Sequence, residues 1–98
     1  MEKKFLVHAK QDSVGVAVAD IQSGEEVEGT LMDSGGKVSL RGQGAVPLGH
    51  KIALAAIKKG EKVVEYGEPI GVATENIQKG AHVHVHNIRS LRWGKASR

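Results

Sequence analysis

Three stretches share one frame: VAVADIQSGEEV at residues 16–27, IALAAIKKGEKV at residues 52–63 and VATENIQKGAHV at residues 72–83. Each follows the pattern apolar-Ala-x-x-x-Ile-x-x-Gly-x-x-Val. The frame predicts a short strand ending at the Ala, then a single helical turn that buries the Ile. A Gly with positive φ ends the turn before the chain re-enters a strand. Because the copies are unevenly spaced, they are not solenoid repeats.

The segment between the first two copies predicts a β-hairpin. Residues 27–32 alternate apolar and polar, DSGG at residues 33–36 has turn composition, and residues 38–40 return. No segment keeps a helical period over three turns. We therefore expect a mostly β chain with short, bent strands and one-turn helices. The expected domain spans residues 1–88, followed by a basic tail at residues 89–98.

The composition favours one small cytoplasmic domain. A chain of 98 residues is one domain that buries only about two-thirds of its unfolded surface, so a partner or oligomer would help it. The absence of cysteine excludes a disulfide scaffold, a thiolate metal site and a Cys nucleophile. The N-terminal stretch MEKKFLVHAK has no apolar run long enough for a signal peptide or a membrane span.

The net charge of +3 comes from the C-terminal end of the chain. Residues 1–88 hold 10 Lys and Arg against 11 Asp and Glu, whereas residues 89–98 hold no acidic residue. A basic tail is not a stripe across a domain, and no aromatic platform accompanies it. Nucleic acid is therefore not an expected partner.

The densest group of potential catalytic or ligating residues is AHVHVHN at residues 81–87. In a strand, His82, His84 and His86 share one face and the valines between them share the other. Neutral imidazole is a common metal ligand and acts as an acid or base near pH 7. A solvated face is an equally good interpretation of this spacing. The outer two residues would lie about 13 Å apart on a straight strand, too far for one ion unless the strand bends.

Two other histidines lie beside charged residues. His50 follows the turn Pro47-Leu48-Gly49 and precedes Lys51, whose ammonium suits a substrate carboxylate. An exposed turn with a solvated lysine is the alternative. His8 ends an apolar run and Asp12 follows, where the aspartate is expected to cap the turn after it. Glu65 and Glu68 flank Tyr66-Gly67 and are expected on the surface.

Three segments together resemble the SAF domain, a β-clip fold, of the altronate/galactarate dehydratase family. They are VPLGHKIAL at residues 46–54, YGEPIG at residues 66–71 and GAHVHVHN at residues 80–87. The opening of the chain, His8 with DSV at residues 12–14, resembles another family motif, with Ser where Asn is usual. The segments occur in the family's order and make a specific set.

This resemblance implies the small subunit of a two-part lyase, which eliminates water or sulfite from a hydroxy acid. The family includes hydro-lyases acting on sugar acids and a (2R)-sulfolactate sulfo-lyase, a sulfo-lyase with a separate small subunit. A larger catalytic partner subunit is implied, because the chain stops where the family's catalytic region would begin. A divalent metal such as iron is also implied, held by this chain or by the partner. The alternative is a non-enzymatic SAF module that binds a carbohydrate-like or acidic ligand.

The elimination chemistry matches the residue types available. A base removes the proton next to a carboxylate, a cation stabilises the resulting charge, and an acid assists the leaving group. The expected catalytic residues are His50, His84 and His86, and the expected substrate-binding residues are Lys51, His8 and Asn87. A shared active site requires the rings of His50 and His84 to converge, whereas a pure binding groove does not.

Overall fold

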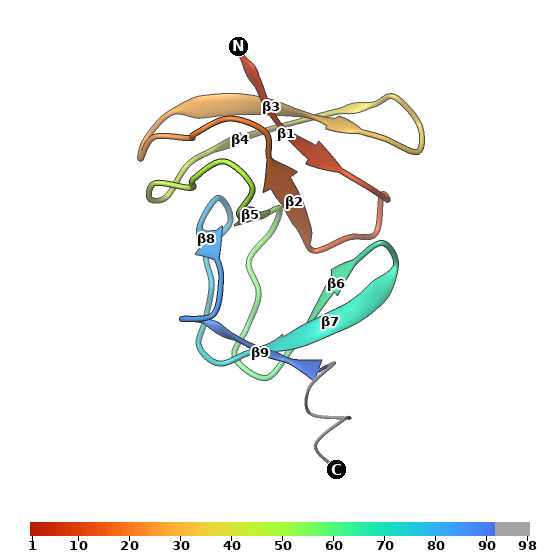
Figure 1. The fold of residues 1–98 in the computed structure, drawn as a ribbon, viewed down its shortest axis with the longest axis vertical. Helices are drawn as coiled ribbons and strands as arrows, with labels where there is room; N and C mark the ends of the chain where they lie inside the picture. The colour runs from red at the N-terminus through yellow and green to blue at the C-terminus, as the bar shows by residue number, and fades with distance from the viewer. Residues whose placement is uncertain (92–98) are drawn as a thin grey trace.

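The computed structural model describes residues 1–91, which form two β-sheets (Figure 1). The first sheet has the strand order β4-β3-β1-β2-β5-β8, and the second has the order β6-β7-β9. The strands of the described residues are β1 (Lys3–Val7), β2 (Val14–Ala17), β3 (Glu26–Leu31), β4 (Lys37–Arg41), β5 (Lys51–Ala53), β6 (Lys62–Glu65), β7 (Glu68–Ala73), β8 (His82–Val83) and β9 (Ile88–Ser90). The expectation of a mostly β fold with short strands is confirmed.

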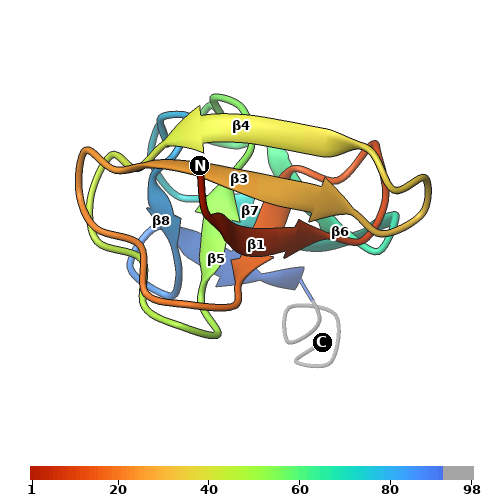
Figure 2. The same ribbon diagram turned by 90° about the horizontal axis from the view of Figure 1, so that it is seen from above.

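The six-stranded sheet is curled rather than flat. Seen from above, β4, β3 and β1 run side by side, whereas β5 and β8 run across them (Figure 2). β1 pairs in parallel with β3 and antiparallel with β2, and the predicted hairpin is the antiparallel pair β3–β4. Gly29 permits the close packing of β1 on β3, because a Cβ there would overlap the ring of Phe5.

The repeated frame forms tight turns, and its expected helical turns are absent. The three isoleucines are buried and the three glycines have positive φ, as predicted: Ile21, Ile57 and Ile77; Gly24, Gly60 and Gly80. Ile57 and Ile77 bridge each other, each amide donating to the other's carbonyl oxygen at 2.8 and 2.7 Å. These extended bridge bonds occupy the backbone groups that a helical turn would use, so the chain turns without a helix.

Two apolar clusters meet at β5. Ile52 belongs to the first, with Phe5 and neighbours on β1 to β4, and Ala53 belongs to the second, with Val83 and neighbours on β6 to β8. All four side chains are at most 1% exposed. Successive residues of a strand face opposite sides, so this short strand joins both halves of the core. His50, the residue before β5, therefore has a firmly placed backbone.

The C-terminal end of the described chain is part of the second sheet. β9 pairs antiparallel with β7, so Arg89 and Ser90 lie in a strand although they fall within the expected basic tail. The rest of that tail, residues 92–98, lies outside the described residues. No helix among the described residues is long and apolar enough to cross a membrane.

Candidate functional site

Three histidines converge where β5 meets β8. The antiparallel register pairs Lys51 with Val83 and Ile52 with His82. Extending that register by one residue brings His50 opposite His84, and their ring centroids lie 4.4 Å apart. His50 Nδ1 lies 2.8 Å from His82 Nε2, so one of these ring nitrogens donates to the other.

The chain bends directly after β8, so the prediction of one straight strand through residues 82–86 is wrong. β8 ends at Val83, and the amides of Asn87 and Ile88 both donate to the carbonyl oxygen of His84. Val85, expected on the same face as Val83, is 81% exposed, whereas Val83 is buried. The bend removes the separation that a straight strand would impose on these histidines.

Asn87 holds this bend through both ends of its side-chain amide. Its Oδ1 accepts from the His84 amide at 2.9 Å, and its Nδ2 donates to the His82 carbonyl oxygen at 2.8 Å. The residue is only 5% exposed. Its position supports a role in placing His82 and His84. The direct substrate contact expected for Asn87 stays a prediction.

Of the expected catalytic histidines, the structure groups His50 and His84 and leaves His86 at the margin. The group of three whose ligand atoms lie within 4.8 Å of one another is His50, His82 and His84. The ring of His86 lies 5.1 Å from that of His82, outside this group. His82 was not among the expected catalytic residues. The sequence signal for His82 was its place in the alternating His-Val run, but that run does not show where the strand ends.

The environment lowers the pKa of two of these imidazoles. Burial is the largest cause for His82, followed by the positive charge that His50, His86 and His84 would carry. For His84 the causes are desolvation, then His50, His86 and the Lys51 ammonium. Both pKa values fall below 6.5, so both rings are neutral at pH 7 and suit a base or a metal ligand.

Lys51 and His8 lie on opposite sides of one buried carboxylate, that of Glu65. The Lys51 ammonium lies 3.7 Å from Glu65 Oε1, and His8 Nε2 lies 3.8 Å from Oε2. Glu65 is only 8% exposed, so its expected surface position is wrong. In β6 it shares the inward face with Val63, two residues earlier. This alternation with Val63 was the signal in the sequence that Glu65 is buried.

The β6–β7 turn is fastened to the segment after β1 and thereby places Glu65. Tyr66 and Gly67 have φ values of 58° and 73°, as a tight two-residue hairpin turn requires. Asp12 accepts from both of their amides, at 2.9 and 3.0 Å. It also accepts from the Ala9 amide at 3.3 Å, so the local turn that it caps precedes it, and the expectation of a following turn is wrong. Ser13 Oγ accepts from the Val64 amide at 3.0 Å, so the serine fills a polar role here.

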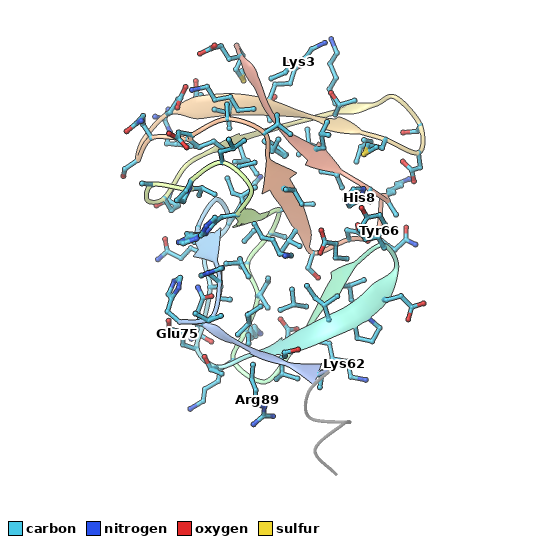
Figure 3. All side chains as sticks on the ribbon, viewed as in Figure 1. Lys3, His8, Lys62, Tyr66, Glu75 and Arg89 are labelled. Atoms are coloured by element: carbon cyan, nitrogen blue, oxygen red, sulfur yellow. The ribbon has the colours of Figure 1, made fainter. Side chains whose placement is uncertain are left out.

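An exposed aromatic surface borders this end of the site. His8 stacks on Tyr66, with centroids 3.6 Å apart and an interplanar angle of 17°. Figure 3 shows the two side chains together at the end of the β6–β7 turn. Tyr66 is 66% exposed. His8 is thus held between a carboxylate and a ring, and no contact in the structure brings it to the other histidines.

A groove of about 620 Å³ opens beside Lys51. Its walls combine Lys51 and Glu65 with apolar side chains from β7 and β9, among them Ile70 and Ile88. No histidine is among the described residues that line this groove, but the Lys51 charge is near enough to His84 to lower the pKa of that imidazole. A small acid in the groove could contact the Lys51 ammonium.

The histidine cluster also fits the divalent metal that the family resemblance implies. The three ligand atoms lie within 4.8 Å of one another, and the closest pair is 2.8 Å apart. Bonds of about 2.1 Å to one ion place ligand nitrogens roughly 3.0–3.4 Å apart. The cluster is therefore close to the size that coordination needs.

Comparison with known proteins matches the chain to one domain family. The altronate/galactarate dehydratase SAF domain matches residues 3–91. A (2R)-sulfolactate sulfo-lyase subunit alpha from Chromohalobacter salexigens is 36% identical over 95% of this chain and 100% of its own length. Altronate dehydratases of Bacillus subtilis and Escherichia coli are 41% and 46% identical over 90% and 86% of this chain. The aligned part is 16% of either dehydratase.

Proposed function

Because the chain belongs to the altronate/galactarate dehydratase SAF domain family, we propose that it is the small subunit of a two-part lyase. The complex eliminates water or sulfite from a hydroxy acid and needs a larger catalytic subunit. The observation that carries the proposal is the convergence of His50 and His84, 4.4 Å apart, beside Lys51. A module that only binds a ligand would not need two imidazoles brought together beside a lysine.

Relative lengths support the two-part arrangement. The alignment covers the whole of the sulfo-lyase subunit alpha but only 16% of either altronate dehydratase. A chain the size of one domain carries part of what the dehydratases hold in one polypeptide. The relative named subunit alpha supports the proposal that a larger partner subunit contributes the rest of the active site.

The chemistry assigns a task to each grouped residue. Lys51 binds the substrate carboxylate, because a cation there stabilises charge that develops when the neighbouring carbon loses its proton. A neutral imidazole of the expected catalytic set, which comprises His50, His84 and His86, accepts that proton. The electron pair left on carbon forms a double bond to the next carbon, whose bond to oxygen or sulfur breaks. Water leaves after protonation of the hydroxyl, or sulfite leaves as the anion, and the enol product becomes a 2-keto acid.

Co-purification tests the proposal. The chain carries an affinity tag without histidines and is expressed with the genes that flank it. The eluate is incubated with altronate, galactarate and (2R)-sulfolactate, and 2-keto acid and sulfite are measured. We expect a larger partner in the eluate and turnover of one of the acids.

Two variants probe the site within that assay. We expect His84→Ala to abolish turnover while the complex still forms. Lys37→Ala removes a lysine whose side chain is 63% exposed on β4, outside the groups described above, and should leave turnover unchanged. If no partner co-purifies, no acid is turned over, and the chain alone binds an acid, the binding module replaces the lyase subunit.

A further inference from the structure

We propose that this chain itself binds one divalent first-row transition-metal ion through ring nitrogens of His50, His82 and His84. This goes beyond the proposed lyase function, because the chain would bind the ion whatever reaction the complex performs. It also makes the metal independent of the partner subunit. It assigns a role to His82, which the elimination chemistry above does not use. It also leaves His86 as the expected catalytic imidazole that can accept the proton, because a ring nitrogen bound to an ion has no free electron pair.

The distances between the ligand nitrogens are close to those of a coordinated ion. The ligand atoms lie within 4.8 Å of one another, and His50 Nδ1 and His82 Nε2 are 2.8 Å apart. Coordination needs nitrogens roughly 3.0–3.4 Å apart. The close pair must separate by only a few tenths of an ångström. His84 is exposed, so its ring has room to move inward.

The backbone that carries these ligands is fixed before any ion arrives. The His50 amide donates to the Pro47 carbonyl oxygen, and the His50 carbonyl oxygen accepts from the Ala17 amide, both at 2.9 Å. His82 lies in β8 and pairs with Ile52. The buried amide of Asn87 bonds to the backbone of both His82 and His84. A preformed ligand set avoids the ordering cost of assembling a site on binding.

The donor set selects the class of ion. All three donors are imidazole nitrogens, and no carboxylate belongs to this group among the described residues. Imidazole suits zinc, iron, nickel and copper, whereas magnesium and calcium require oxygen ligands. Three protein ligands leave at least one coordination position open, as in catalytic zinc sites. An ion here could therefore bind an oxygen of a small acid.

The competing interpretation is a hydrogen-bonded pair of imidazoles with a third ring beside it. In that case the proton shared by His50 and His82 holds the cluster, and a metal has no favoured place. The two interpretations differ in a measurable way, because an ion that binds both nitrogens must break this hydrogen bond and move its proton to the other nitrogen of the same ring. The hydrogen-bonded pair alone gives neither stoichiometric binding of an ion nor the absorption bands of Co²⁺ bound to nitrogen.

Titration of the full chain tests the inference. The protein is purified through a tag without histidines, stripped with EDTA, and titrated with Co²⁺ and Zn²⁺ by visible absorption and calorimetry. We expect one ion per chain, the visible bands of Co²⁺ bound to nitrogen, and no comparable binding of Mg²⁺. Absence of stoichiometric binding, or equal binding of Mg²⁺, would overturn the inference.

Three variants locate the site. His82→Ala and His84→Ala should each weaken binding more than about tenfold, because even residues that only orient ligands contribute tenfold or more. His8→Ala removes a histidine that stacks on Tyr66 instead and should bind like the wild type. Circular dichroism checks that each variant folds. His84→Ala is the variant least able to disturb the fold, because His84 is exposed. Equal affinity in all three variants would place the ion elsewhere and refute the assignment.

The outcomes separate this inference from the lyase proposal. A chain that binds the ion but never forms an active complex contradicts the lyase proposal alone. An active complex whose small subunit binds no ion contradicts the metal site alone.

Discussion

Asn87→Ala should destabilise the chain and loosen the histidine cluster. The substitution removes two hydrogen bonds, of 2.9 and 2.8 Å, and leaves the His84 amide and the His82 carbonyl oxygen without these partners. At about 0.5–1.5 kcal/mol for each bond, the free energy of unfolding should fall by about 1–3 kcal/mol. Burial, with Asn87 only 5% exposed, favours the upper half of that range.

Asn76→Ala is the matched control. Asn76 is exposed, and its Oδ1 accepts one hydrogen bond, from the Lys59 amide at 2.9 Å. Its loss should cost no more than about 1 kcal/mol, because water can replace the asparagine at an exposed amide. Urea unfolding followed by circular dichroism gives both free energies. A cost for Asn87→Ala no greater than that for Asn76→Ala would refute the argument that this amide holds the bend.

Further predictions concern the turns, pH and substrate binding. Gly80→Ala should lower the free energy of unfolding in urea more than Gly60→Ala does. Both glycines have φ near 90°, where a side chain costs about 1–2 kcal/mol. Of the two, only Gly80 lies where an added Cβ would overlap a backbone carbonyl oxygen. Without metal, the free energy of unfolding should fall as pH drops below 6.5. The pKa values of His82 and His84 are lowered in the folded chain, so the unfolded chain binds more protons in this pH range. If His82→Ala leaves the slope of the unfolding free energy against pH unchanged, this prediction is contradicted. Lys51→Ala should raise the KM of the complex for its acid substrate at least tenfold. An unchanged KM would exclude Lys51 as the residue that binds the substrate carboxylate.

Much of the fold was predictable because it depends on local patterns. The glycines of the repeated frame have the positive φ expected of them, and the isoleucines are buried. The hairpin of β3 and β4 follows from alternation and a glycine turn. The helical turn within the frame was a wrong prediction, because long-range bridges such as Ile57 to Ile77 take the backbone bonds first. Local sequence gives no sign of a partner that lies far along the chain.

The site was predictable in part. His50, His84 and Lys51 were expected at the site, and the structure brings the two rings together with the lysine next in sequence. Glu65 was assigned to the surface because it flanks the turn residues Tyr66 and Gly67, although it shares the alternation of Val63. A buried carboxylate is acceptable there because Lys51 and His8 lie within 4 Å of it. Lys51 lies in β5 and His8 directly follows β1, so these partners become visible only after folding.

The sequence by itself determined the residue types and the pattern that assigns the chain to a β-rich SAF family. It did so because turn glycines, alternating apolar residues and short motifs act within a few residues of one another. The tertiary structure decided which histidines meet. The pairing of β5 with β8 brings His82 beside His50, and the side chain of Asn87 holds the bend that carries His84 to them. Register and bending depend on hydrogen bonds between distant segments, which no local pattern specifies.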